Sequence, residues 1–254
     1  MALQMSMVLF RESPTLSASA IQAALVEHWP DLPAPTETKE GDGTISFGLG
    51  DVDVVLGVMP APVPWSDLEG PCATSVLWPE AAAEVQAHRV HVIVTVSGEL
   101  DPIELSTALT QATAAVMASS ELAIGVFWTN AALLAPKALF NDFAAEVLPL
   151  GPPIHIWVDF RVGRIDESHS AGFTTGMAAL GLMELEARHA PEKPSELHER
   201  FTSIAEYLLT QGPVIGDGDT IGTSEDEKIQ VVYSPSEFGI EGEVMRFVYA
   251  DEEV

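Results

Sequence analysis

The chain has 254 residues and a formal net charge of −27, because 38 Asp and Glu residues stand against 11 Lys and Arg residues. Hydrophobic residues make up 47% of the sequence, which excludes a disordered acidic tail and predicts a folded core. An acidic surface repels nucleic acid and anionic membranes, and it attracts cations and basic partners. Three hypotheses account for the charge: a solubility device, adaptation to a salty cytoplasm, or capture of a basic protein.

The sequence also carries information about the compartment. Its one cysteine, Cys72, cannot form an internal disulfide and has no acid–base neighbour in sequence, so we expect a structural thiol. The first ten residues are apolar, but no Lys or Arg precedes them, which favours a buried strand over a signal peptide. No stretch approaches 18 consecutive apolar residues, so no membrane span is predicted. We therefore expect a cytoplasmic protein.

The first hundred residues are predicted to follow the order β-α-β-β-α-β. The expected elements are strands at residues 5–10, 44–49, 52–59 and 90–96, and helices at residues 17–29 and 79–88. Residues 33–43 are polar and are expected to form a loop. The valines of residues 90–96 alternate with His91, Ile93 and Thr95, which predicts that the valines face the core.

A helix at residues 101–119 begins the second half, with Asp101 as its cap and Pro102 as its first residue. The elements expected after it are strands at 122–128, 153–163, 228–233 and 243–249, helices at 136–148 and 195–211, and a partly extended segment at 173–187. Without the first helix this half again has the order of a ferredoxin-like domain. We predict an α+β fold with mixed, antiparallel-rich sheets and helices on one side. The order suggests a tandem ferredoxin-like duplication into residues 1–100 and 101–254, which either form two domains or share one core.

Four polar side chains are spaced two residues apart on the expected strand 153–163. They are His155, Trp157, Asp159 and Arg161, and successive members of such a row are about 7 Å apart on one face. The row is either a binding face, with the indole as a platform and the guanidinium as an anion clamp, or an ordinary solvated or helix-covered face. In the second case its charges pair with cross-strand neighbours.

Glu184 and Glu186 are also two residues apart, and His189 follows Glu186 by three. In a helix, Glu186 and His189 could share a metal, although such sites need further ligands from other helices. In a strand, the two glutamates could form a carboxylate pair for acid–base catalysis. The simpler alternative is a solvated acidic face.

Asp217 and Asp219 lie in a glycine-rich segment that has the first ligand positions of an EF-hand calcium loop. The twelfth position of that pattern is Lys228 instead of the bidentate glutamate. We therefore reject an EF-hand, expect a tight turn, and predict no metal or cofactor. No P-loop, dinucleotide fingerprint, zinc-protease motif, C-x-x-C or nucleophile elbow is present, so no catalytic residue is assigned.

Three stretches in the last third carry a resemblance to a known family. They are residues 174–177 with 181–186, residues 217–222, and residues 228–231 with 234–236. In spacing and order they resemble a bacterial family known as domain of unknown function 4261. The resemblance implies a bacterial cytoplasmic protein and brings no activity, cofactor or catalytic residue with it. It adds interest to Glu184, Glu186, Asp217 and Asp219 as members of a binding face.

The leading hypothesis is a non-catalytic accessory protein that captures a basic partner, since the charge comes without a catalytic signature. The alternative is a small-molecule enzyme built around His155, Asp159 and Arg161, or around Glu184 and Glu186. No nucleic acid and no membrane is expected as a partner.

Overall fold

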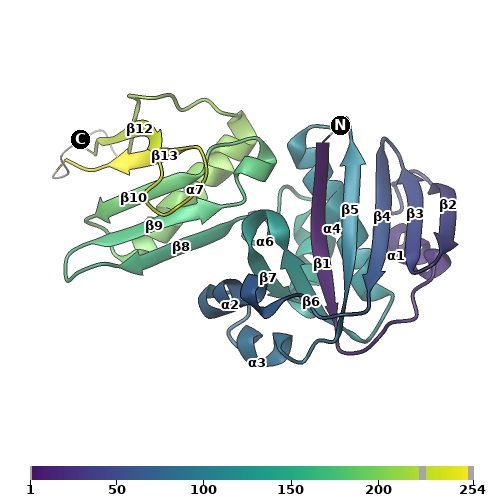
Figure 1. Ribbon diagram of the computed structural model, residues 1–254. Helices are drawn as coiled ribbons and strands as arrows, with labels where there is room; N and C mark the ends of the chain where they lie inside the picture. Colours follow the sequence, from purple (N-terminus) through teal and green to yellow (C-terminus); the bar gives the residue numbers. More distant parts are fainter. Residues whose placement is uncertain (1, 223–226, 251–254) are drawn as a thin grey trace. The chain divides into compact units, whose positions relative to one another are not determined.

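A computed structural model describes residues 2–222 and 227–250 (Figure 1). The chain divides into two compact units, unit 1 from Met1 to Trp157 and unit 2 from Val158 to Val254. The boundary expected between residues 100 and 101 falls inside unit 1, between a strand and the helix that follows it.

Unit 1 contains a seven-stranded sheet in the order β2-β3-β4-β5-β1-β6-β7. The strands are β1 (Ala2–Phe10), β2 (Thr36–Gly41), β3 (Thr44–Leu49), β4 (Val52–Met59), β5 (Val90–Gly98), β6 (Ala123–Trp128) and β7 (Leu133–Pro136). Every neighbouring pair is antiparallel. Alternation positions the core, because successive side chains of a strand point to opposite faces. As predicted, the valines of β5 at 92, 94 and 96 are fully buried.

Helices cover both faces of this sheet, so the expectation of helices on one side is wrong for unit 1. On one face lie α1 (Ala18–His28), α4 (Pro102–Ala118) and α5 (Lys137–Asp142). Asp101 caps α4 as predicted, because its carboxylate accepts the N–H groups of Ile103 and Glu104. On the other face, α2 (Trp65–Thr74) and α3 (Ala81–Val85) pack over β1, β6 and β7 in one apolar cluster.

Other elements of unit 1 also differ from the sequence-based prediction. Residues 33–43, expected as a loop, contain β2, whose residues are all exposed. The helix expected over 136–148 is α5 followed by a π-helical segment, Phe143–Val147. The strand expected over 153–163 is a short helix, α6 (Ile154–Trp157), followed by a strand of unit 2.

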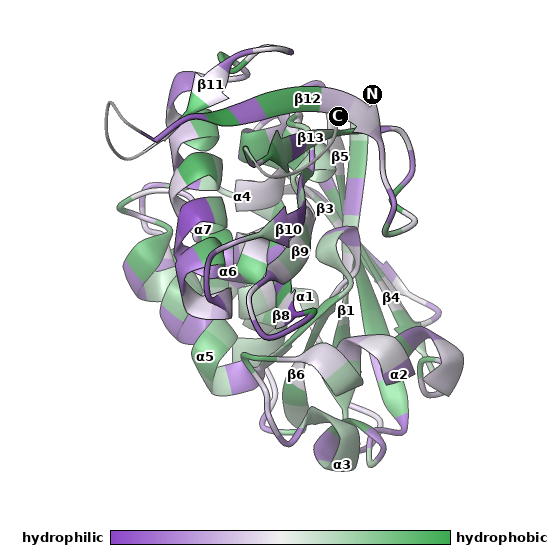
Figure 2. Cartoon of the chain, turned by 90° about the vertical axis from the view of Figure 1, so that its left-hand side faces the viewer, coloured by the Kyte–Doolittle hydropathy of each residue, from purple (hydrophilic) through white to green (hydrophobic). Residues whose placement is uncertain are grey.

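Unit 2 contains a six-stranded sheet in the order β11-β12-β13-β10-β9-β8. The strands are β8 (Asp159–Arg164), β9 (Ser170–Thr175), β10 (Leu185–Ala190), β11 (Thr220–Ile221), β12 (Ile229–Pro235) and β13 (Glu243–Val248). Only β10 and β13 pair in parallel among the described strands. The helix α7 (Pro194–Gln211), with its hydrophobic and hydrophilic stripes visible in Figure 2, packs on one face, where Phe201 meets Phe247 at a centroid distance of 5.5 Å.

The predicted α+β class with antiparallel-rich sheets is confirmed. The tandem ferredoxin-like duplication is not confirmed. In unit 1 no neighbouring strands are parallel, whereas a β-α-β unit joins parallel strands. In the described part of the chain, no helix is long and apolar enough to cross a membrane.

Candidate functional site

The predicted row of polar side chains is not formed, because its first half is helical. His155 and Trp157 lie on α6 in unit 1, whereas Asp159 and Arg161 lie on β8 in unit 2. Trp157 is 1% exposed, and its indole N–H donates a hydrogen bond of 2.8 Å to the hydroxyl of Thr110 on α4. The expectation of Trp157 as an exposed binding platform is therefore wrong.

Asp159 and Arg161 do share one face of β8. Their side chains form an ion pair with each other, with an Nε–Oδ2 distance of 2.7 Å, and not with the cross-strand neighbours expected in the second interpretation. Burial raises the pKa of Asp159, and the hydrogen bond and charge of Arg161 oppose that rise. The guanidinium of Arg161 also lies over the ring of Phe173 on β9, with its central carbon 5.9 Å from the ring centroid.

Glu184 is 6% exposed, so the solvated acidic face is wrong at this position. Its carboxylate accepts hydrogen bonds from the hydroxyl of Thr174 (2.7 Å) and from the backbone N–H groups of Gly176 (2.8 Å) and Ala178 (3.0 Å). These bonds fix the turn that follows β9, where Gly176 has a φ of 113°. Glu184 is therefore a structural carboxylate that holds the chain between β9 and β10.

Glu186 is fully buried on β10 and has a different set of donors. It accepts hydrogen bonds from Nε of Arg188 (2.9 Å), the hydroxyl of Ser236 (2.6 Å) and the backbone N–H of Glu237 (3.2 Å). The two carboxylates therefore have separate partners and do not form the predicted acid–base pair. His189 follows a register shift between Ala187 and Ala190 of β10, and its ring lies beside that of His169 at a centroid distance of 6.1 Å.

The aspartates of the glycine-rich segment act as turn residues. Asp217 accepts the N–H of Tyr233 at 2.9 Å, and Asp219 accepts the N–H of Gly216 at 2.7 Å. The first bond attaches the turn to β12 and the second closes the turn itself, in agreement with the predicted tight turn. Over residues 2–222 and 227–250 no group of three or more His, Cys, Asp or Glu side chains is placed to hold a metal ion.

Sequence reasoning missed the surroundings of Glu186, which we call the arginine face. This is the face of the second sheet opposite α7, and its members are Arg161, Phe173, Glu186, Arg188, Ser234 and Arg246. Phe238 covers part of it by stacking on Phe173 at a centroid distance of 5.0 Å. The available signal was Arg246 itself, since a cation within the apolar run of β13 indicates a strand with one polar face.

Sequence reasoning also missed an uncovered part of the sheet in unit 1, which we call the bare face. It lies toward the viewer in Figure 1, where no helix crosses β4 or β5, on the side opposite α4. The strand register brings together Leu3, Met5, Val55, Met59 and Ile93. Met7, next along β1 on this side, packs against the apolar cluster of α2 and α3. Leu3 is 63% exposed, Met59 41% and Val55 40%. A methyl group added at Gly57, in the middle of this face, would meet nothing within 4 Å.

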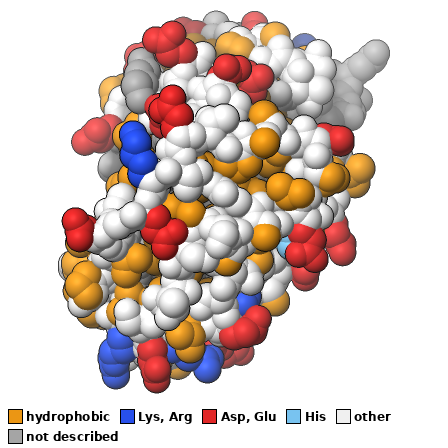
Figure 3. Space-filling model, turned by 90° about the vertical axis from the view of Figure 1, so that its right-hand side faces the viewer, with side chains coloured by type: hydrophobic (Ala, Val, Ile, Leu, Met, Phe, Trp, Pro, Cys, Tyr) orange, Lys and Arg blue, Asp and Glu red, His pale blue; other side chains and the backbone are white. Residues whose placement is uncertain are grey.

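Three acidic residues lie at one end of the bare face. Asp53 lies on it, and Asp51 and Glu99 lie at the same end of β4 and β5. Lys39, on the edge strand β2, shares the face through its pairing with Ser46. Unit 1 has 18 Asp and Glu residues against 4 Lys and Arg residues. Figure 3 shows acidic side chains spread among apolar ones on one side of the molecule.

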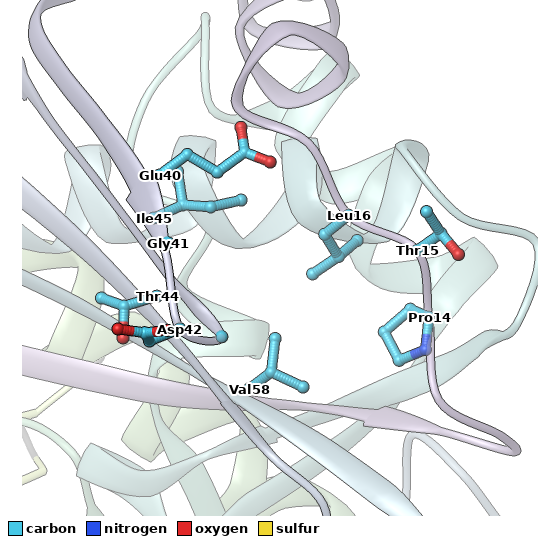
Figure 4. A pocket seen from close by; sticks show the side chains of 10 residues that line it. Pro14, Thr15, Leu16, Glu40, Gly41, Asp42, Thr44, Ile45 and Val58 are labelled. Atoms are coloured by element: carbon cyan, nitrogen blue, oxygen red, sulfur yellow. The ribbon is translucent and has the colours of Figure 1, made fainter.

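Each unit has a hollow in its surface. One in unit 1, of about 420 Å³, lies between residues 14–16, the β2–β3 hairpin and Val58 (Figure 4). Its Glu40 carboxylate is already used, because it accepts the N–H of Ala18 at the start of α1 at 2.9 Å. The carboxylate of Asp42 is the other acidic group in its lining. The remaining polar side chains of the lining are the hydroxyls of Thr15 and Thr44, and no His, Cys, Lys or Arg is among the lining residues.

The other hollow, of about 560 Å³, lies along α7 in unit 2 and contains part of an ionic network. Arg200 bonds to Glu192 through Nε at 2.7 Å and to Glu227 through Nη2 at 2.6 Å, and the hydroxyl of Tyr249 donates to Glu192 at 2.9 Å. Burial alone would lower the pKa of Arg200, but the two carboxylates raise it. Burial and then the charge of Glu192 raise the pKa of Tyr249, so the phenol stays protonated. Each group of the network has a hydrogen-bond partner, although one guanidinium faces two carboxylates.

The comparisons with known proteins bear on unit 2. Residues 173–248 match the family described as Domain of unknown function (DUF4261). No curated protein and no solved structure matches the chain. The matched residues run from β9 to β13 and include Glu184, Glu186, Asp217 and Asp219. The resemblance noted in the sequence is therefore confirmed, and the last third of this chain matches the DUF4261 family.

Proposed function

We propose that this protein is a non-catalytic interaction protein of the bacterial cytoplasm, and that it captures a basic partner on the bare face of unit 1. The observation that carries the proposal is the bare face itself: an apolar sheet surface left uncovered in a strongly acidic unit. Contiguous exposed apolar surface on a folded protein marks a binding surface more often than chance exposure does.

The composition of the bare face indicates what kind of surface its partner presents. Two of its five members, Met5 and Met59, are methionines, whose flexible side chains adapt to different apolar shapes. Asp51, Asp53 and Glu99 at one end supply negative charge that speeds the approach of a positive surface. The partner is therefore a protein that presents apolar side chains with Lys or Arg residues beside them.

The competing hypothesis is a small-molecule enzyme. The two arrangements from which it started differ from those expected, since His155 lies on a helix instead of the predicted strand and the carboxylates of Glu184 and Glu186 have separate donors. No other group of acid, base and nucleophile among the described residues favours it.

Capture from a lysate with matched variants tests the proposal. Val55→Glu puts a carboxylate in the middle of the bare face, whereas Val26→Glu puts the same group on α1, where Val26 is 54% exposed. Both variants add one negative charge, so they attract a basic partner equally at long range. We expect the wild type and Val26→Glu to retain a basic protein that elutes in a salt gradient. With that protein purified, Val55→Glu binds at least about tenfold more weakly, or about 1.4 kcal/mol.

Circular dichroism must first show that both variants fold. Equal affinity of the two variants for the purified partner would mean that the bare face is not the binding surface. An association rate that does not change with salt would remove the electrostatic part of the proposal.

A further inference from the structure

Three arginines lie on the arginine face of unit 2, and their strand neighbours show which way they point. Phe160, next to Arg161, contacts the ring of His198 on α7, and Phe247, next to Arg246, contacts Phe201 on α7. Since side chains alternate along a strand, the guanidinium groups are on the side away from α7. Unit 2 also has seven of the eleven Lys and Arg residues of the chain.

Two of these arginines have carboxylate partners. Arg161 pairs with Asp159, and Arg188 pairs with Glu186 and Glu237. Both arginine side chains are mostly buried, at 25% and 15% exposure. Pairing of this kind is expected in a chain with so many carboxylates.

Arg246 is different, although it faces Glu186 across the parallel pair β10–β13. The oxygens of Glu186 are bonded to Arg188, Ser236 and the N–H of Glu237. The Nε of Arg246 is buried and has no hydrogen-bond partner among the described residues. The hydroxyl of Ser234 is likewise buried and has no hydrogen-bond partner among the described residues. The strand register places Ser234 diagonally across from Arg246 on the same face.

Two unpaired, buried polar groups side by side are costly, because each loses its water without gaining a partner. The guanidinium N–H groups and the serine hydroxyl are donors that fit the oxygens of one small anion. We propose that Arg246 and Ser234 form a binding site for an oxyanion, the carboxylate or phosphate group of a small ligand. This site lies in unit 2 and is independent of the bare face.

The net charge of unit 2 argues for recognition at short range. Unit 2 has 20 Asp and Glu residues against 7 Lys and Arg residues, so its long-range field repels an anion. Binding therefore depends on directed hydrogen bonds from Arg246 and Ser234, which are strongest when one partner is charged. For this reason the loss of the Ser234 hydroxyl alone weakens binding measurably.

Nuclear magnetic resonance of the whole ¹⁵N-labelled chain tests the site directly. The seven arginines give separate Nε–Hε signals, which are followed while sodium phosphate, and separately sodium acetate, is added at constant ionic strength. We expect the Arg246 signal to shift and saturate, with a dissociation constant of the order of 1 mM. Saturation at lower phosphate concentration identifies a phosphate ligand, and saturation at lower acetate concentration identifies a carboxylate ligand.

Two variants provide the control. Ser234→Ala keeps the Arg246 signal and is expected to weaken binding about threefold to tenfold. Arg164→Lys changes an exposed arginine of β8, and is expected to leave the Arg246 titration unchanged. The proposal is overturned if the Arg246 signal moves only in step with that of Arg164 for both anions, or if Ser234→Ala leaves the dissociation constant unchanged.

Discussion

The indole of Trp78 lies directly over Gly125 of β6. A methyl group added at Gly125 would be 2.8 Å from Cη2 of that ring and 2.5 Å from the carbonyl oxygen of Ala135. Gly57 of β4 is on the same face of the same sheet, and a methyl group there would meet nothing within 4 Å. One sheet face is therefore closely covered over β6 and open over β4.

This contrast predicts opposite effects of one substitution. Gly125→Ala is expected to lower the free energy of unfolding by about 1–3 kcal/mol, because Trp78 and β7 must move to make room. Gly57→Ala is expected to be neutral or to stabilise by up to about 1 kcal/mol, because it reduces the freedom of the unfolded chain. Urea unfolding followed by circular dichroism measures both. Equal losses in the two variants would show that the face is covered at Gly57 as well.

The hydrogen bond from Trp157 to Thr110 links α6 to α4, and Thr110 in turn donates to the carbonyl of Ser106 at 2.7 Å. Thr110→Val keeps the shape of the side chain but leaves the buried indole N–H without an acceptor. We expect a loss of about 1–3 kcal/mol in the free energy of unfolding. Thr110→Ser retains the hydroxyl and should cost less. If the valine variant is as stable as the wild type, the hydrogen bond from Trp157 does not contribute to stability.

His88 makes stability depend on pH. Its Nε2 accepts the N–H of Val63 at 2.8 Å, its Nδ1 bonds to the carbonyl of Val85, and burial lowers the pKa of the ring, with His91 and Arg89 adding to the effect. Below about pH 6.5 the unfolded chain binds a proton that the folded chain does not. The free energy of unfolding should therefore fall as pH drops from about 6.5 to the lower pKa of the folded state, by at most about 1.4 kcal/mol per pH unit.

His88→Gln is expected to remove this part of the slope, whatever its effect at neutral pH. His28→Gln, at an exposed position on α1, should retain it. Unfolding curves measured at several pH values between about 5 and 7 give the comparison. A slope in His88→Gln equal to that of the wild type would assign the pH dependence to other groups.

The excess of acidic residues in unit 1 predicts a dependence on salt. Lys137 is the one Lys or Arg of unit 1 with an ion pair among the described residues, and its partner Glu121 is 98% exposed. Screening should therefore stabilise the unit, most strongly between about 0.01 and 0.15 M salt, where the Debye length falls from about 30 to about 8 Å. Stability that levels off above this range indicates simple relief of repulsion. A rise that continues into molar salt would favour adaptation to a salty cytoplasm.

Some elements were predictable because their own residues determine them. The alternating valines of β5 and the Asp101 cap of α4 needed no tertiary information. β2 was missed because its residues, TETKEG, are exposed and carry no hydrophobic pattern, so main-chain pairing with β3 holds the strand. Residues 153–163 alternate as a strand should, but the turn after Pro152 and the bond from Trp157 to Thr110 favour a helix at the start.

The sequence was enough to select residues of the candidate site, but it did not show which groups surround their side chains. Glu184 and Glu186 were singled out from the sequence, and a charged side chain is normally expected in solvent. Their burial depends on donors that spacing cannot reveal: N–H groups of a turn for Glu184, and Ser236 from the end of β12 for Glu186. The position of Arg246 opposite Glu186 is known only from the register of β10 and β13, which the sequence does not reveal.

The single cysteine has a practical consequence. Cys72 lies on α2 and belongs to the apolar cluster that contains Leu68 and Trp78, and burial raises the pKa of its thiol. Such a thiol reacts with a labelling reagent only while α2 and α3 have moved off the sheet and the thiol is ionised. The rate of labelling at this one sulfur therefore measures how often α2 and α3 move away from the sheet, and no probe has to be introduced.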